Sequence, residues 1–447
     1  MPKHPVSTLT IATPSVLKTV LEAPGIHDDH FRFPAGFLWG AATSSHQVEG
    51  DCTGNDWWAW EQAGKVAQPS GKACDHYHRF REDFDIAQGL HHNAHRLSFE
   101  WSRIEPEEGR FDPEALAHYR TVLEALRERG MEPIVTLHHF TLPVWLAERG
   151  GWEAPAVEEY FARYAARVLD ECNDLARWWI TINEPVVHVF KSYVLGQWPP
   201  GKQDSTTAFR VVRHMLRAHV LAYHAIHERR PDAMVSVAKH ALALSSCNPR
   251  NWRDRLAVKV RSYVFNDLFL DALQTGALRV PGLFWERLPQ ARTLDFIGLN
   301  YYTRDFVHHA GLSLPGLLGD VCTLEHHRDV GARNDLGWEI YPEGLAHFLR
   351  SFSRFRLPIL ITENGVPMQR DEDRWTFLYL HLWQAARALQ RGAPVIGYLC
   401  WSLLDNFEWA DGYAARFGLV GVDFETQERT VRESARRLAR VIQENGL

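Results

Sequence analysis

Short apolar runs recur along the chain, and each is followed by a longer stretch that mixes apolar and polar positions. The first four runs are FLWGAAT (37–43), AHRLSF (94–99), PIVTLH (133–138) and WWITIN (178–183). The other four are VSVAKH (235–240), DFIGLN (295–300), PILITE (358–363) and IGYLCW (396–401). Near-continuous apolar runs of this length are typical of parallel strands covered by helices. The pattern therefore predicts eight buried parallel strands.

The stretches between these runs have the period of amphipathic helices. In 113–129, 156–173 and 374–391, apolar residues recur at three- and four-residue spacing. Eight alternating units predict an α/β fold, a single (β/α)8 TIM barrel with its active site at the C-terminal ends of the strands. The alternative is an open doubly wound sheet, which favours a glycine-rich phosphate turn after the first strand. The segment FLWGAATSSHQVEG (37–50) contains no GxGxxG.

The chain divides into an N-terminal extension, 1–32, and the barrel, 33–447. Within the extension, a small apolar stripe at 16–21 follows Ser15, a residue suited to capping a helix. We expect a short helix that docks on the barrel, with disorder or a subunit contact as the alternatives.

Composition and charge exclude several classes of protein. The 447 residues contain 49 Lys and Arg against 55 Asp and Glu, a net charge of −6, whereas a nucleic-acid binder needs a basic surplus or stripe. No run of about 18 apolar residues is present, so neither a transmembrane helix nor a membrane partner is expected. The first 25 residues lack an uninterrupted apolar segment, and the six cysteines form no CxxC. These features predict free thiols in a cytoplasmic protein, although an even count leaves disulfides open.

Five of the eight runs lead directly into polar, ionisable or aromatic residues suited to a site. These residues are His138, His139, Asn183, Glu184, Asn300, Glu363 and Trp401. Any one of them could be a helix cap or a loop residue, but five such ends on one rim favour a site. Glu184 and Glu363 belong to the fourth and seventh predicted strands, which face each other across a barrel mouth.

Two facing carboxyl groups suit glycoside hydrolysis, which uses one acid and one nucleophile or base. Carboxyl groups about 5–5.5 Å apart retain the anomeric configuration, and groups about 6.5–9.5 Å apart invert it. Isomerases and lyases also use an acid–base pair, so the pair alone leaves the reaction open.

Long motifs in a fixed order resemble glycoside hydrolase family 1, the retaining β-glucosidases and their relatives. The resemblance runs from about Phe33 to Gly446. The first motifs are FLWGAATSSHQVEG (37–50), ACDHYHRF (73–80), AHRLSFEWSRIEP (94–106) and TLHHFTLPVWL (136–146). The others are WWITINEP (178–185), DFIGLNYYT (295–303), LPILITENG (357–365) and GYLCWSLLDNFEWADGYAARFGLVGVDF (397–424).

The resemblance implies catalytic roles for the two glutamates. Glu184 matches the general acid/base and Glu363 the nucleophile of a double displacement. Arg96 and Tyr302 match residues that keep the nucleophile charged, because a cation and hydrogen bonds to an anion lower a carboxyl pKa. Conversely, a negative Glu363 is expected to raise the pKa of Glu184, which has to start protonated.

The resemblance also implies a set of sugar-binding residues. They are Gln47, His139, Asn183, Trp338, Trp401, Glu408 and Trp409. Asn183 matches the partner of the sugar 2-hydroxyl, and Asn300 a neighbour that orients it. Trp401 matches the platform under the sugar ring, and Trp338 the platform for the aglycone.

Two positions, Glu408 and Glu184, limit the class of substrate that the resemblance implies. Relatives that act on phosphorylated sugars usually carry Ser where Glu408 stands, and a carboxylate would repel phosphate. Thioglucosidase-like relatives tend to carry Gln in place of Glu184. The resemblance thus implies an exo-acting β-glycosidase for terminal, unphosphorylated β-D-glucosides, with β-galactosides and β-fucosides as further substrates. No cofactor is expected, the partner is a small glycoside or short oligosaccharide, and a homo-oligomer is left open.

Other functions and some departures from the family pattern stay open. A non-catalytic sugar-binding relative would typically lack one carboxylate, and net transglycosylation would use the same residues. The 24 histidines, with HYH (76–78) and HH pairs at 91–92, 138–139, 308–309 and 326–327, raise metal catalysis as a further alternative. HYH opens a predicted helix, which is the wrong place for a barrel metal site, so no catalytic metal is expected. At three positions where Tyr is frequent in the family, this chain carries His46, His95 and His138. These histidines are interpreted either as replacements of similar shape or as changes of polarity around the site.

Overall fold

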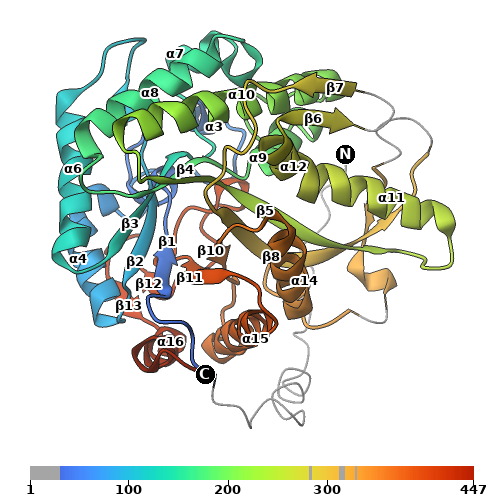
Figure 1. Cartoon of the computed structure of the whole chain (residues 1–447). Helices are drawn as coiled ribbons and strands as arrows, with labels where there is room; N and C mark the ends of the chain where they lie inside the picture. Colours follow the sequence, from blue (N-terminus) through green and yellow to red (C-terminus); the bar gives the residue numbers. More distant parts are fainter. Residues whose placement is uncertain (1–30, 281–283, 312–317, 328–329) are drawn as a thin grey trace.

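Eight parallel strands close into a barrel in the computed structural model, which describes residues 31–280, 284–311, 318–327 and 330–447 (Figure 1). The strands are β1 (Leu38–Ala42), β2 (Ala94–Ser98), β3 (Glu132–His138), β4 (Trp178–Asn183), β5 (Met234–Ser246), β8 (Ile297–His308), β10 (Ile359–Asn364) and β11 (Val395–Trp401). Neighbouring strands pair in parallel around the ring, and the β11–β1 and β10–β8 pairings close it. The predicted TIM barrel and all eight predicted strands are confirmed. The predicted N-terminal extension lies outside the described residues, except for Phe31 and Arg32.

One apolar layer fills the inside of the barrel. It consists of Ala94, Ile134, Ile180, Ala238, Phe296, Leu360 and Leu399, all fully buried, with Leu38 packed against them. Because strand side chains alternate, one residue from each strand or its entry points inward at this level. The interior is therefore packed with side chains, and a ligand has to bind at the mouth.

Helices cover the outside of the barrel. The covering helices are α4 (His76–Gly89), α6 (Pro113–Glu128), α8 (Val157–Cys172), α10 (Ser205–Arg229), α12 (Leu268–Thr275), α14 (Pro342–Phe352), α15 (Asp371–Gln390) and α16 (Glu433–Glu444). The helices from α4 to α12 pack side by side in succession, as do those from α14 to α16, and the three predicted helical stretches coincide with α6, α8 and α15. At the start of α6, Asp112 accepts hydrogen bonds from the backbone N–H groups of Glu114 and Ala115, which fixes that end.

Further helices and strands lie in the loops. They are the helices α2 (Ser45–Val48), α3 (Asp56–Gln62), α5 (Trp101–Ile104), α7 (Val144–Glu148), α9 (Pro185–Val189) and α11 (Trp252–Ser262), and the strands β6 (Ala277–Val280), β7 (Phe284–Arg287), β9 (Asp320–Cys322), β12 (Val420–Val422) and β13 (Arg429–Val431). Most of these elements follow the C-terminal ends of barrel strands, so they surround the mouth.

Strands β5 and β8 continue together well beyond the barrel (Figure 1). Their parallel pairing runs on to Ser246 and Val307, and β9 then adds antiparallel to the far end of β8. These paired ends form a small sheet outside the rim, which we call the rim arm (243–247, 304–308 and 320–322).

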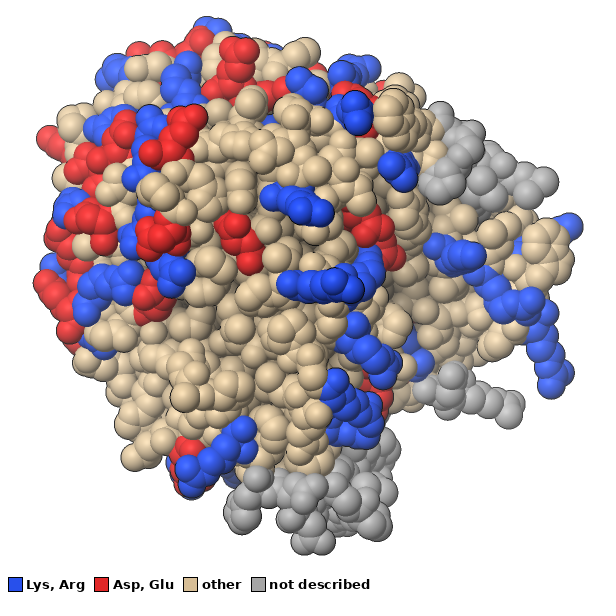
Figure 2. All heavy atoms as spheres, in the orientation of Figure 1, with Lys and Arg blue, Asp and Glu red and all other residues tan. Residues whose placement is uncertain are grey.

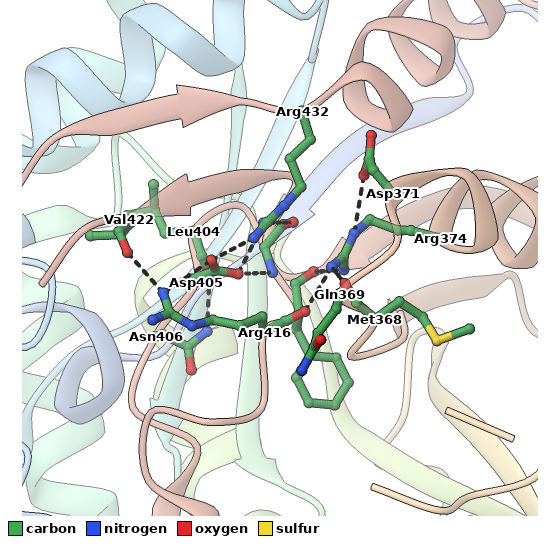
Figure 3. A network of polar contacts seen from close by, with 12 residues as sticks. Met368, Gln369, Asp371, Arg374, Leu404, Asp405, Asn406, Arg416, Val422 and Arg432 are labelled. Atoms are coloured by element: carbon green, nitrogen blue, oxygen red, sulfur yellow. Dashed lines mark hydrogen bonds and ion pairs between the residues drawn. The ribbon is translucent and has the colours of Figure 1, made fainter. Parts of the chain in front are cut away.

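A network of charged side chains braces the loop that follows β11 (Figure 3). The carboxylate of Asp405 is almost fully buried and forms ion pairs with Arg432 and Arg416. Beside it, the buried guanidinium of Arg374 on α15 donates to the carbonyl groups of Val366 and Met368. The network joins the loop after β11 to the loop after β10.

The first described residues meet the C-terminus of the chain. The N–H of Phe33 donates to the carbonyl of Asn445 at 2.9 Å, and the Trp39 indole donates to the Asn445 side chain at the same distance. Since Trp39 lies in the first half of β1, the C-terminus lies near the N-terminal ends of the strands, away from the mouth.

Acidic and basic side chains are interspersed along one edge of the visible face, and basic ones are scattered over its centre and right (Figure 2). This mixture fits the near-balanced net charge of −6. Among the described residues, none of the helices combines the length and apolar character needed to span a bilayer.

Candidate active site

Glu363 lies near the C-terminal end of β10, and both of its carboxylate oxygens accept hydrogen bonds. Arg96 on β2 donates to Oε1 in a buried ion pair, and the hydroxyl of Tyr302 on β8 donates to Oε2 at 2.5 Å. Both carboxylate oxygens therefore accept a hydrogen bond from a different strand. Such contacts orient the group and stabilise its anionic form.

Glu184 follows β4 in a left-handed backbone conformation, with φ 43° and ψ 55°, and immediately precedes α9. Its N–H donates to the carbonyl of Ala238 on β5 at 2.8 Å, which holds this strained turn. The Asn300 amide donates to Glu184 Oε1 at 2.8 Å, and His240 Nδ1 lies 3.1 Å from the same oxygen. The hydrogen bonds from described residues to this carboxyl group therefore all reach Oε1.

One chain of hydrogen bonds connects the two glutamates. Arg96, which binds Glu363, also donates to Asn183 Oδ1 at 2.6 Å. Asn300, which binds Glu184, donates to the same Asn183 oxygen at 3.2 Å. The two carboxyl groups are thus fixed on a common scaffold of four strands.

Burial raises the pKa of Glu363 to about 7, although Arg96 and the Tyr302 hydroxyl act to lower it. The negative charge of Glu184 also raises this pKa. The contacts from Arg96 and Tyr302 thus act in the predicted direction, but burial and the charge of Glu184 outweigh them in the free chain.

The pKa of Glu184 is lowered, against the prediction from the sequence. Burial acts to raise it, but His240, the Asn300 amide and Lys239 together outweigh burial. The prediction considered only the charge of Glu363 and overlooked two basic side chains on β5. Since Glu363 and Glu184 sense each other's charge, the pair retains one proton to a higher pH than an isolated carboxyl group does.

Gln47, Glu408 and Trp401 lie together on one side of the mouth. Gln47 Nε2 donates to the carbonyl of Phe407 at 2.9 Å and to Glu408 Oε2 at 3.3 Å, and the Trp401 indole donates to the same Glu408 oxygen at 3.4 Å. Burial raises the pKa of Glu408 to about 8, and the charges of Asp411 and Glu363 add to this effect.

His139 joins this side to the catalytic scaffold. Its Nε2 lies 3.1 Å from the Asn183 amide nitrogen, and its ring is nearly parallel to those of Trp401 and Trp409. Its Nδ1 is buried and has no hydrogen-bond partner. A buried nitrogen of this kind is suited to a ligand hydroxyl.

The remaining predicted tryptophans lie in two aromatic clusters. Trp409 packs with Trp57, Phe140 and Trp198. Trp338, which is half-buried, packs with Trp401 and Phe417 in the other cluster, close to Tyr302. The structure thus brings all the residues predicted for the site to one end of the barrel.

The three unusual histidines pack around this site. His46 stacks on Trp409 with ring centroids 5.5 Å apart, and Asn55 and Glu61 bind its two ring nitrogens. His95 contacts Thr43, and His138 accepts from the Trp152 indole. Of the HYH motif, His76 faces Asp83 at the start of α4, outside the site.

Lys239 and His240 were missed from the sequence. The apolar pattern predicts VSVAKH (235–240) only as a strand, although its last residue occupies the same rim position as the other polar strand ends. Lys239 is fully buried, and burial lowers its pKa to about 7 while Glu184 acts to raise it. Applying the same strand-end criterion to this run would have identified His240.

A parallel barrel with two linked carboxyl groups at its strand ends places the chain in the class that includes the barrel-fold glycosidases. The family model for glycosyl hydrolase family 1 matches residues 29–281 and 285–447. The chain therefore belongs to glycosyl hydrolase family 1 and is an O-glycoside hydrolase of the β-glucosidase and β-glycosidase type.

Individual relatives match over nearly their whole length. A β-glucosidase A from Thermotoga maritima is 35% identical over 93% of this chain and 99% of its own. A β-glycosidase structure from Pyrococcus horikoshii is 37% identical, with a TM-score of 0.88, over 94% of this chain and 96% of its own. The Thermotoga maritima β-glucosidase in complex with glucoimidazole is 34% identical, with a TM-score of 0.85, over 93% of this chain and 100% of its own.

Proposed function

We propose that this chain is a retaining, exo-acting β-glycosidase, in which Glu363 is the nucleophile and Glu184 the acid/base. The observation that carries the proposal is the pair of contacts to Glu363. Arg96 binds one of its oxygens and Tyr302 the other, which orients the group as a carboxylate that attacks a carbon atom requires. A water-activating base in an inverting enzyme needs room for water at one of these oxygens.

In the first step, Glu363 attacks the anomeric carbon while Glu184 protonates the departing glycosidic oxygen. When the shared proton lies on Glu184, its charge no longer raises the pKa of Glu363, and Arg96 and Tyr302 stabilise the Glu363 anion. The carbon–oxygen bond to the aglycone breaks, and an ester bond to Glu363 forms.

In the second step, Glu184 removes a proton from water, which attacks the anomeric carbon and releases Glu363. Because the esterified Glu363 carries no charge, the contacts from His240 and Asn300 favour an anionic Glu184 at this stage. An alcohol in place of water would give transglycosylation with the same residues.

The proposed substrate is a terminal, unphosphorylated β-D-glucoside, with β-galactosides and β-fucosides as further substrates. Gln47, His139 and Glu408 would bind the sugar hydroxyls, Asn183 the 2-hydroxyl, and Trp401 the sugar face. Phosphate on the sugar would approach the carboxyl groups of Glu408 and Asp411. The relative bound to glucoimidazole supports a sugar-sized ligand. A cytoplasmic location stays a prediction from the sequence.

Proton NMR of the first-formed product tests the stereochemistry. With 4-nitrophenyl β-glucoside, we expect β-glucose first, with the α-anomer growing in later by mutarotation. A 2-deoxy-2-fluoroglucoside with a good leaving group should form an ester that peptide mass spectrometry places on Glu363. An initial α-anomer would contradict retention, and an ester on another residue would contradict the assignment of the nucleophile.

A further inference from the structure

Two cysteines and a histidine converge on the rim arm, away from the residues of the catalytic site. The Sγ atoms of Cys247 and Cys322 and a ring nitrogen of His308 all lie within 4.8 Å of one another. They come from three neighbouring segments, the residue after β5, the end of β8 and the end of β9. We propose that these three side chains bind one thiolate-preferring metal ion, of which Zn²⁺ is the representative.

The backbone holds the three residues in place. The Cys247 N–H donates to the carbonyl of Val307 at 2.8 Å, next to His308. Cys322 pairs with Phe306 in the antiparallel ladder between β8 and β9. The three side chains are therefore fixed by sheet hydrogen bonds before any ion binds.

Asp254 on α11 reinforces this arrangement. Its carboxylate accepts from the backbone N–H of Asn248 and from that of His309, both at 3.1 Å. These residues directly follow Cys247 and His308. One buried carboxylate thus ties together the two chain segments that carry two of the three ligands.

The spacing suits tetrahedral coordination. Zn–S bonds of about 2.3 Å and Zn–N bonds of about 2.0–2.1 Å place the ligand atoms about 3.5–4 Å apart. Beside this set of three, His326 Nδ1 lies 3.3 Å from the Cys322 sulfur. Cys322 and His326 stand four residues apart, on β9 and on the short turn of 3₁₀ helix (Leu324–His326) that follows it.

The exposure of the ligands favours entry of an ion from solvent. Cys322 is buried, Cys247 and His308 are half-buried, and His326 is exposed. No hydrogen bond between described residues occupies the His308 ring, so this ring is available to an ion.

A second convergent group, His46, Cys52 and Glu100, serves as an internal comparison. Both ring nitrogens of His46 are already bound, by Asn55 and by Glu61. Glu100 accepts from the hydroxyl groups of Ser45, Ser102 and Thr141. The ring nitrogens of His46 and the carboxylate of Glu100 are thus already engaged by neighbouring side chains, so we assign no ion there.

A bound ion would lock the rim arm and leave the catalytic chemistry unchanged. It would crosslink β5, β8 and β9 at their far ends. Because the ion would bind the folded chain and not the unfolded one, it would raise the midpoint temperature of thermal unfolding. Because cysteines bind as thiolates, the affinity should fall as the pH falls.

Titration of the reduced full-length chain with Co²⁺ tests the site. We expect one equivalent to produce a thiolate-to-cobalt charge-transfer band and the visible bands of tetrahedral Co²⁺, and Zn²⁺ to displace it. Cys247→Ser and His308→Gln should each weaken binding by more than about 100-fold, beyond the loss typical of an outer partner. Cys172→Ser, a buried thiol on α8, and His78→Gln, an exposed histidine, should leave binding unchanged.

Cadmium-113 NMR on the wild-type chain gives a readout that does not depend on any variant. A chemical shift that reports two sulfur ligands would support the site. A shift that reports only nitrogen and oxygen ligands would overturn it. Co²⁺ bands that stay unchanged in Cys247→Ser would also overturn the proposal. The same holds if the protein, once freed of reductant, contains a Cys247–Cys322 disulfide in place of a bound metal. Turnover of 4-nitrophenyl β-glucoside should be the same with and without Zn²⁺, which separates this proposal from the catalytic one.

Discussion

Arg96 is the side chain through which the two halves of the catalytic site are held together. It is fully buried and binds Glu363 with one nitrogen, Asn183 with another and Thr136 with its Nε. A planar guanidinium can satisfy these acceptors at once, which a lysine ammonium cannot do with the same geometry. In the proposed mechanism, the positive charge of Arg96 also compensates the negative charge of the attacking Glu363 carboxylate.

Removing the carboxyl group of Glu184 should affect substrates according to their leaving groups. In Glu184→Ala, we expect kcat/KM for an alkyl β-glucoside to fall by about 10²–10⁴-fold, because the leaving oxygen needs a proton. For 4-nitrophenyl β-glucoside, kcat/KM should fall far less, while kcat falls because water is no longer activated. Steady-state kinetics on the two substrates measure the difference.

Glu363→Gln provides the contrast for this experiment, since losing the nucleophile should abolish turnover of both substrates. Added azide should restore kcat of Glu184→Ala on the nitrophenyl substrate and give a β-glycosyl azide. Equal losses on both substrates would count against Glu184 as the acid.

The pH dependence of the reaction should report the two basic residues beside Glu184. His240 and Lys239 lower the pKa of Glu184. Replacing either base, in His240→Asn or Lys239→Met, should therefore raise that pKa. The alkaline limb of kcat/KM, which reports loss of the acid's proton in the free enzyme, should move to higher pH.

Lys202→Met is the matched control, because Lys202 is half-exposed and pairs with Glu153, not with Glu184. Its pH profile should coincide with that of the unmodified chain. An alkaline limb that stays in place in both β5 variants, or moves to lower pH, would show that these side chains do not set the protonation of Glu184.

At the scale of elements, the loop after β11 depends on charges that come from distant segments. Asp405 has both oxygens bound by arginines, and it also accepts from the N–H of Gly418 at 2.9 Å. In Figure 3, Arg416 and Arg432 converge on this carboxylate while Arg374 lies beside it. The same loop carries Glu408 and Trp409, so its stability bears on the sugar binding proposed for these two residues.

Asp405→Ala should destabilise the fold by about 2–4 kcal/mol, since it leaves guanidinium groups without their anion in a largely buried place. Denaturant unfolding measures this change, and we expect KM for glucosides to rise as the loop loosens. Glu433→Ala, which removes exposed ion pairs to Arg436 and Arg440, should change stability by less than about 1 kcal/mol. Similar losses in the two variants would contradict a bracing role for Asp405.

The apolar runs sufficed to place all eight barrel strands, but not the full length of β5 and β8. Their outer halves, ALALSS (241–246) and YYTRDFVH (301–308), mix polar and apolar residues because the rim arm is only partly covered. Hydrophobic pattern marks what is buried, so a partly exposed strand escapes it. The left-handed turn at Glu184 escapes it as well, since it depends on a hydrogen bond to Ala238 from another strand.

At the scale of the whole molecule, the family resemblance predicted which residues lie together at the mouth of the barrel. Reasoning from single residues did not predict the net pKa shifts of the two glutamates. Motif matching brought residues as distant as Gln47 and Glu408 into one site, and the structure places them 3.3 Å apart. The pKa directions of Glu184 and Glu363 depend on how deeply the groups are buried and on Lys239 and His240. These are properties of the assembled mouth, which no single motif contains.

The meeting of Phe33 with Asn445 has a practical consequence for handling the enzyme. The C-terminus lies at the opposite end of the barrel from Glu184 and Glu363. A chain attached to a bead or an electrode through Leu447 would therefore present its mouth to the bulk solution. Covalent immobilisation through that end should preserve access for dissolved substrates, whereas random coupling through surface lysines would leave some molecules with the mouth against the support.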